Sequence, residues 1–220
     1  MINFFDDRPL RIENFRSIQE ELNLPAYNFV KHVSSRWLTL QDASKRLIEQ
    51  WKAIMKYFLE YIPLRQNNTL KSKQYQDIVE LIKMKNMKAQ VLFVSSSVKI
   101  FNRFTGTFQK SEPLIHILYD ELKRLGKTPI GKICKHASIK KFGLVEKVLE
   151  SENLLLAKDI KLDDEVEVEL SQLDETIQLE IKIRPQKHFV VACKHMLQKS
   201  AINNDVKYCQ CLQAEQRRLS

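Results

Sequence analysis

Residues 39–62 read TLQDASKRLIEQWKAIMKYFLEYI, and this stretch decides the class of fold. Its apolar residues recur at spacings of three and four, which is the period of one face of an α-helix. Thr39 can cap the amino end through its hydroxyl, and Asp42 lies in the first turn, where a helix favours negative charge. We therefore predict one helix of about six turns, ending near Ile62 because Pro63 has no backbone N–H to continue it.

The same spacing predicts helices along most of the chain. Only four glycines and six prolines occur in 220 residues, too few for the frequent tight turns of a sandwich or barrel. We therefore predict a mainly α-helical protein. The further predicted helices cover Asp7 to Leu22, Lys71 to Met84, Met87 to Phe108, Pro113 to Gly126, a poorly capped stretch from Gly131 to Leu149, and a last helix that begins at Pro185.

Three segments have some strand character. Residues 26–33 are rich in aromatic and β-branched side chains, and we predict a short strand there. Residues 91–98 could form a strand by propensity alone, but the helical spacing that continues beyond them favours a long helix. Residues 166–170 alternate with strand period; we predict a loop leading into a helix, with a short strand as the alternative, because an isolated strand would leave its backbone groups unpaired.

Charge is unevenly distributed along the chain. The net charge is +9, yet residues 150–184 hold eleven acids against four bases, which leaves about +16 for the rest. Such asymmetry favours a polyanionic partner for the basic part, although lysine-rich helix faces are as readily explained by solvation. One basic group runs from Lys123 to Lys141. The lysines predicted to contact DNA are Lys71, Lys73, Lys83, Lys85 and Lys88.

The four cysteines predict free thiols and no metal site. They are Cys134, Cys193, Cys209 and Cys211, and each has a histidine or cysteine two positions away. Structural zinc ligands usually stand further apart within a pair, so that both can turn toward one ion. No apolar run approaches the ~20 residues of a membrane span and no secretory leader opens the sequence. We expect reduced thiols, no membrane association, and a nuclear or cytoplasmic protein.

Several blocks of sequence, taken in order, resemble the C-terminal half of hAT-superfamily transposases and their domesticated relatives of the zinc-finger MYM-type and SCAN/BED-associated kind. No block is specific by itself. The blocks are FRSIQ (15–19), SSRWLTL (34–40), ASKRLIEQW (43–51), FNRFTGTFQ (101–109), EPLIHILYDEL (112–122) and a weaker one within residues 189–212.

The resemblance implies a fragment of an RNase H-like core, with one or two short strands plus helices, interrupted by a large all-helical insertion. It assigns residues 1–40 to the core, 41–149 to the insertion, 150–185 to an acidic linker, and 186–220 to a C-terminal helix and tail. Such transposases cleave DNA with three carboxylates that hold two metal ions. No Asp or Glu here matches any of the three, so we predict no catalytic residue, no metal, no cofactor and no enzymatic activity.

The resemblance also singles out Arg36 and Trp37. It implies a Trp that stabilises a flipped base, and a guanidinium beside it can clamp a phosphate. Packing of Trp37 against the following helix is the alternative. The sequence thus predicts a catalytically incomplete hAT-derived protein that associates weakly and non-specifically with DNA. A helical protein-interaction module, or a fragment of a longer transposase-like gene product, is the alternative.

Overall fold

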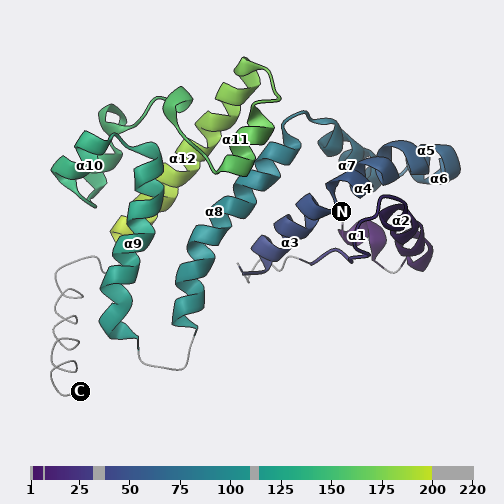
Figure 1. Cartoon of the computed structure of the whole chain (residues 1–220), viewed down its shortest axis with the longest axis horizontal. Helices are drawn as coiled ribbons and strands as arrows, with labels where there is room; N and C mark the ends of the chain where they lie inside the picture. Colours follow the sequence, from purple (N-terminus) through teal and green to yellow (C-terminus); the bar gives the residue numbers. More distant parts are fainter. Residues whose placement is uncertain (1, 7, 32–37, 110–113, 200–220) are drawn as a thin grey trace. The chain divides into compact units, whose positions relative to one another are not determined.

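The computed structural model describes residues 2–6, 8–31, 38–109 and 114–199 (Figure 1). Regular structure in that part of the chain is helical, and the only β-type pairing found there is one isolated bridge between Cys134 and Leu154. The prediction of a mainly α-helical protein is confirmed. The RNase H-like core fragment, the insertion and the boundaries drawn from them remain predictions.

The chain forms two compact units, which we describe separately. Unit 1 comprises residues 1–98 and 168–173, and unit 2 comprises residues 99–167 and 174–220. Unit 1 contains α1 (Ile2–Phe5), α2 (Pro9–Glu21), α3 (Leu38–Glu49), α4 (Trp51–Lys56), the π-helix η1 (Tyr57–Tyr61), α5 (Ile62–Arg65), α6 (Asn67–Leu70), α7 (Lys73–Lys83) and the first part of α8 (Met87–Phe108). Unit 2 contains the rest of α8, α9 (Ile115–Ile133), α10 (His136–Phe142), the short 3₁₀ turns η2 (Glu146–Leu149), η3 (Ser151–Asn153) and η4 (Ala157–Asp159), most of α11 (Asp164–Leu170), and α12 (Glu175–Lys199).

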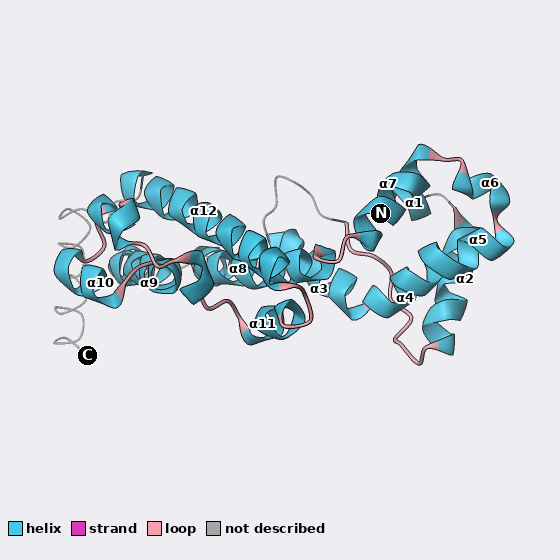
Figure 2. Ribbon diagram, turned by 90° about the horizontal axis from the view of Figure 1, so that it is seen from above, coloured by secondary structure: helices cyan, strands magenta, loops and turns pink. Residues whose placement is uncertain are grey.

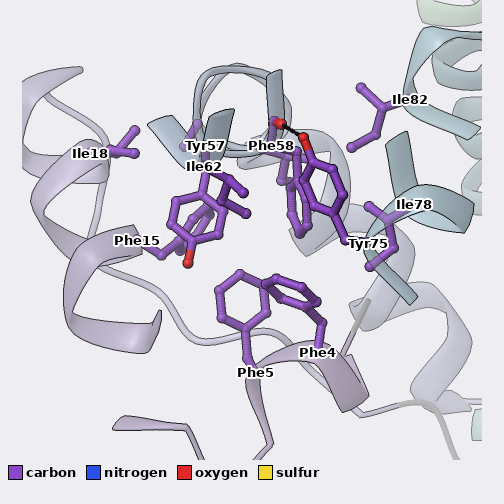
Figure 3. Close-up of a cluster of buried hydrophobic side chains, with 12 residues drawn as sticks. Phe4, Phe5, Phe15, Ile18, Tyr57, Phe58, Ile62, Tyr75, Ile78 and Ile82 are labelled. Carbon is purple, nitrogen blue, oxygen red and sulfur yellow. Dashed lines mark hydrogen bonds between the residues drawn. The ribbon is translucent and has the colours of Figure 1, made fainter. Parts of the chain in front are cut away.

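Unit 1 is built around a cluster of aromatic side chains (Figure 3). Phe4, Tyr57 and Phe58 are completely buried, and the Phe5 ring centroid lies 5.3 Å from that of Phe15 and 5.6 Å from that of Tyr57. Aromatic pairs at such separations each contribute about 0.5–1.5 kcal/mol beyond their area burial. The short helix α1, which the sequence analysis missed, supplies Phe4 and Phe5 and thereby closes this core.

The helix predicted over residues 40–62 exists but is not continuous. It bends at Gln50, where φ is −95° and ψ is 8°, and it widens to a π-helix over Tyr57–Tyr61. The chain then continues helically through Pro63 to Arg65, so the predicted stop at Pro63 is wrong. Pro63 lies in the first turn of the segment after the π-helix, where a missing N–H is tolerated.

Two predictions for the residues just before this helix, a cap and a strand, are also wrong. Thr39 lies inside α3, which the structure describes from Leu38 onward, and is therefore not the cap. The described part of the predicted strand, Ala26 to Lys31, pairs with no other strand. Side-chain amides from Gln19 and Gln50 bond the backbone carbonyls of Tyr27 and Pro25 instead, and so take the place of a partner strand.

The predictions for the next two helices are confirmed. Helix α7 runs from Lys73 to Lys83, and Ser72 caps it by accepting a hydrogen bond from the Tyr75 N–H at 3.3 Å. Helix α8 spans the predicted residues 87–108, so the strand alternative for residues 91–98 is wrong. Their buried positions follow the three-to-four spacing of the sequence, with Ile78 and Ile82 packed into the aromatic core.

Unit 2 is organised by α9 and α12, which run alongside each other (Figure 2). Gly126, predicted to end a helix, lies within α9, and a Cβ added there would stand 2.7 Å from Met196 Cε on α12. This glycine therefore permits close packing and does not end the helix, which continues through Pro129 to Ile133. The stretch from Gly131 to Leu149, predicted as one helix, is divided among α9, α10 and η2.

The last helix begins ten residues earlier than predicted, since α12 starts at Glu175 and contains Pro185 in its interior. Pro185 is buried in a stripe with Ile181, Phe189 and Cys193, spaced four residues apart along one face. An internal proline costs a helix roughly 3 kcal/mol, and here its ring lies on the buried face, where it adds to the packing of the stripe. Residues 166–170 lie within α11, so the loop predicted there and the strand alternative are both wrong.

Candidate nucleic-acid interface

The residues predicted to touch DNA fall into two groups. Arg36 and Trp37 lie outside the described residues. The five lysines lie around α7 in unit 1: Lys71 follows α6, Lys73 and Lys83 stand on α7, Lys85 lies in the following turn, and Lys88 is on α8.

The structure does not gather these lysines into an acid-free surface. Lys88 is half-buried, and its ammonium group lies 2.5 Å from a carboxylate oxygen of Glu169. The exposed face of α7 also carries Asp77 and Glu80 between Lys73 and Lys83. Charges of alternating sign on one helix are typical of a solvated surface.

A stronger concentration of positive charge lies in unit 2. Residues 123–147 contain eight lysines and arginines but a single acid, Glu146. We call these residues the basic segment; it covers the carboxyl half of α9, all of α10 and the start of η2. Most of these lysines form a visible run in the sequence, but the lysines predicted to contact DNA lie around α7.

Some cations of the basic segment have partners within unit 2. Arg124 forms an ion pair with Glu121, and Lys132 Nζ lies 2.5 Å from Asp163 Oδ1. Lys135 donates to a backbone carbonyl of η3 at 2.6 Å. These contacts hold α9 and the loops that follow it in place, so these side chains are structural.

Three of the other five cations, Lys140, Lys141 and Lys147, lie on α10 and η2 beside Phe142, whereas Lys123 and Lys127 lie on α9. The ammonium groups of Lys141 and Lys147 lie 5.0 and 5.3 Å from the centroid of the Phe142 ring, and Lys140 is exposed next to them. No carboxylate within the described ranges pairs with these three lysines. We call Lys140, Lys141, Phe142 and Lys147 the lysine–phenylalanine patch.

Such a patch offers two elements of nucleic-acid recognition. Lysine ammonium groups neutralise phosphates without regard to sequence, and an aromatic ring can stack on an unpaired base. Cations within about 6 Å of a ring are attracted to its face. Phe142 thereby draws lysines from two separate elements together. The Lys-Lys-Phe triplet was visible in the sequence, whereas the contribution of Lys147 depends on the turn after α10.

Four of the eleven acids in residues 150–184, which we call the acidic segment, form ion pairs within the chain. Besides the pairs that Glu169 and Asp163 make, Glu167 pairs with Lys182 at 3.0 Å and Glu180 pairs with Arg184 at 2.8 Å. Glu167 also accepts a hydrogen bond from the Leu162 N–H at 2.8 Å. The protein-interaction alternative remains a prediction.

The thiols described by the structure are buried. Burial raises the pKa of Cys134 to about 11, and burial together with the nearby Cys134 raises that of Cys193 to about 12. Both are free, whereas His136 and His195 beside them are exposed. Within the described ranges, no three His, Cys, Asp or Glu side chains gather closely enough to hold a metal ion. Cys209 and Cys211 lie outside those ranges.

None of the helices in the described part of the chain combines the length and apolarity that a membrane crossing needs. Comparison of the chain with models of known protein families, with curated proteins and with solved structures found no match.

Proposed function

We propose that this protein associates with nucleic acid without sequence specificity, through the lysine–phenylalanine patch of unit 2. The observation that carries the proposal is the placement of Lys141 and Lys147 against Phe142, with exposed Lys140 beside them and no carboxylate pairing with any of the three in the described residues. These groups supply charge and a stacking surface. None of them can activate water, so the proposal assigns binding and no cleavage to them.

We further propose that the chain derives from a hAT-type transposase. Two sequence blocks that carry the resemblance meet in unit 1: Gln19 of the first block donates a hydrogen bond to Gln50 of the third at 2.8 Å, and both side chains are completely buried. Phe15 of the first block lies in the aromatic core. A shared buried contact gives a physical reason for these residues to occur together, and it supports the proposal.

The binding proposal is tested by removing the charge of the patch. The triple variant Lys140→Ala/Lys141→Ala/Lys147→Ala should bind a labelled duplex of about 20 base pairs more weakly, as measured by fluorescence anisotropy between 50 and 200 mM salt. Each phosphate contact contributes about −0.9 to the slope of log affinity against log salt on duplex DNA. The slope should therefore become shallower by about 2–3.

The matched control is Lys158→Ala/Lys161→Ala/Lys187→Ala, which removes the same charge from exposed positions of unit 2. We expect a smaller loss of affinity, because charges remote from the bound phosphates add little beyond the screening length, which is about 10 Å at 0.1 M salt. Equal losses in both triple variants, or no binding by the unmodified protein at 50 mM salt, would refute the proposal.

Phe142→Ala should weaken binding of single strands more than of duplex, since only unpaired bases can stack.

A further inference from the structure

The described residues that line a cleft in unit 1 include three arginines and no acid. The first turn of α2 forms one side, and the end of α5 with the start of α6 forms the other. Its volume is about 640 Å³. The described lining residues are Arg8, Pro9, Leu10, Arg11, Arg65, Gln66, Asn68 and Thr69. We call this the arginine cleft.

The arginines of the cleft are held by contacts other than ion pairs. Arg11 donates to the Phe4 carbonyl at 2.8 Å and places its guanidinium 4.0 Å from the centroid of the Phe4 ring. The guanidinium of Arg65 lies 5.9 Å from the centroid of the Tyr61 ring. Among the described residues no carboxylate pairs with Arg8, Arg11 or Arg65. Ring faces can orient a guanidinium while leaving its edge N–H groups available to a ligand.

The end of α2 adds further positive potential. This helix has 13 residues, no side chain caps its amino end, and no acid stands in its first turn. A helix amino end carries about half a positive charge and favours an anion. Here two of the residues at that end, Arg8 and Arg11, are themselves cations. Asp6 lines a separate pocket with Phe5, Phe15 and Arg16 and is not among the described residues that line the cleft.

Uncompensated charge of this kind is relieved by a bound anion. Three guanidinium groups exceed what one carboxylate can neutralise, and a phosphate offers up to two charges and several oxygens that match the guanidinium fork. The side chains of Gln66, Asn68 and Thr69 can donate to the remaining oxygens. We propose that the arginine cleft binds a phosphate group, carried either by a free nucleotide or by the backbone of a nucleic acid. This proposal does not depend on the interface in unit 2.

The first test uses inorganic phosphate as the probe. Isotope-labelled full-length protein is titrated with phosphate at constant ionic strength, and the side-chain N–H signals of arginine are followed by NMR. We expect saturable shifts confined to the cleft arginines. Arg65→Ala should weaken phosphate binding at least about tenfold, and Arg65→Lys should restore it only in part, because an ammonium group cannot form the bidentate contact.

Lys52→Ala serves as the matched control, since it removes one exposed charge from unit 1 without lining the cleft. Arg8→Ala provides a second cleft variant, so that the result does not depend on one substitution. Circular dichroism establishes that each variant folds. The proposal is overturned if phosphate gives no saturable shift, or if Lys52→Ala weakens binding as much as Arg65→Ala.

The second test distinguishes the two sources of phosphate. A nucleoside monophosphate and an oligothymidylate without terminal phosphates are titrated into the Lys140→Ala/Lys141→Ala/Lys147→Ala variant, whose unit 2 patch is removed. Binding of the monophosphate alone assigns the cleft to free nucleotides. Binding of the oligonucleotide that is lost in Arg65→Ala assigns it to the nucleic-acid backbone. If neither probe shifts the cleft arginines, the proposal fails, whatever the unit 2 patch binds.

Discussion

Replacing Gln50 by leucine tests whether side-chain amides hold unit 1 together in place of a strand. Gln50 is completely buried, accepts a hydrogen bond from Gln19 at 2.8 Å and donates to the Pro25 carbonyl at 3.2 Å. Leucine has a similar volume but can make neither bond. Two lost bonds at about 0.5–1.5 kcal/mol each predict that the free energy of unfolding falls by about 1–3 kcal/mol.

The assay is native-state hydrogen exchange of backbone amides in α2 and α4, because these helices report on unit 1 alone even if the two units unfold separately. Gln74→Leu, at an exposed position of α7, is the control and should change stability by no more than about 0.5 kcal/mol. The double variant Gln19→Leu/Gln50→Leu should be less damaged than the sum of the single variants, since both remove the same bond. If Gln50→Leu costs no more than the control, the amide network does not stabilise this unit.

Three further outcomes follow from the structure. Ser72→Ala removes the cap of α7 and should lower the free energy of unfolding by about 1 kcal/mol in urea denaturation. Gly131→Ala, at a helical position with open space around it, should raise the free energy of unfolding by about 0.5–1 kcal/mol. Gly126→Ala should raise it by less, because the side chain of Met196 must move to make room for the new methyl group. The buried thiols of Cys134 and Cys193 hold their protons more tightly than unfolded thiols, whose pKa is near 9, so their contribution to stability is complete below pH 9 and should decline as the pH rises toward 12. Replacing both cysteines by alanine should remove the loss of stability that ionisation of their thiols causes at alkaline pH.

Periodicity predicted much of the fold. The spacing of apolar residues placed α7 and α8 correctly, because the buried positions of both helices match the helical period. These are local signals, and no tertiary contact is needed to interpret them. They fixed the mainly α-helical class before any coordinate was known.

The errors arose where tertiary packing overrides a local rule. Pro63, Gly126 and Pro185 were each interpreted as helix boundaries, and each lies within a helical run. The π-helix, the contact with Met196 and the buried stripe on α12 permit this, and all three depend on residues distant in the sequence. A propensity scale cannot weigh such contacts.

The candidate sites were less predictable than the fold. A run of lysines indicates charge, but only the structure shows that Lys88 and Lys132 are paired while Lys141 and Lys147 converge on Phe142. The arginine cleft joins positions more than fifty residues apart, and no spacing in the sequence indicates that Arg11 and Arg65 line one surface.

The wide turns between Tyr57 and Tyr61 amount to one surplus residue in an otherwise regular helix. Winding the same residues as an ordinary α-helix would advance everything downstream by one further residue step, about 100° around the axis. Ile62, now completely enclosed, would swing toward water, and Arg65 would leave its position opposite α2. The wide turn therefore determines which face of the helix Ile62 and Arg65 occupy.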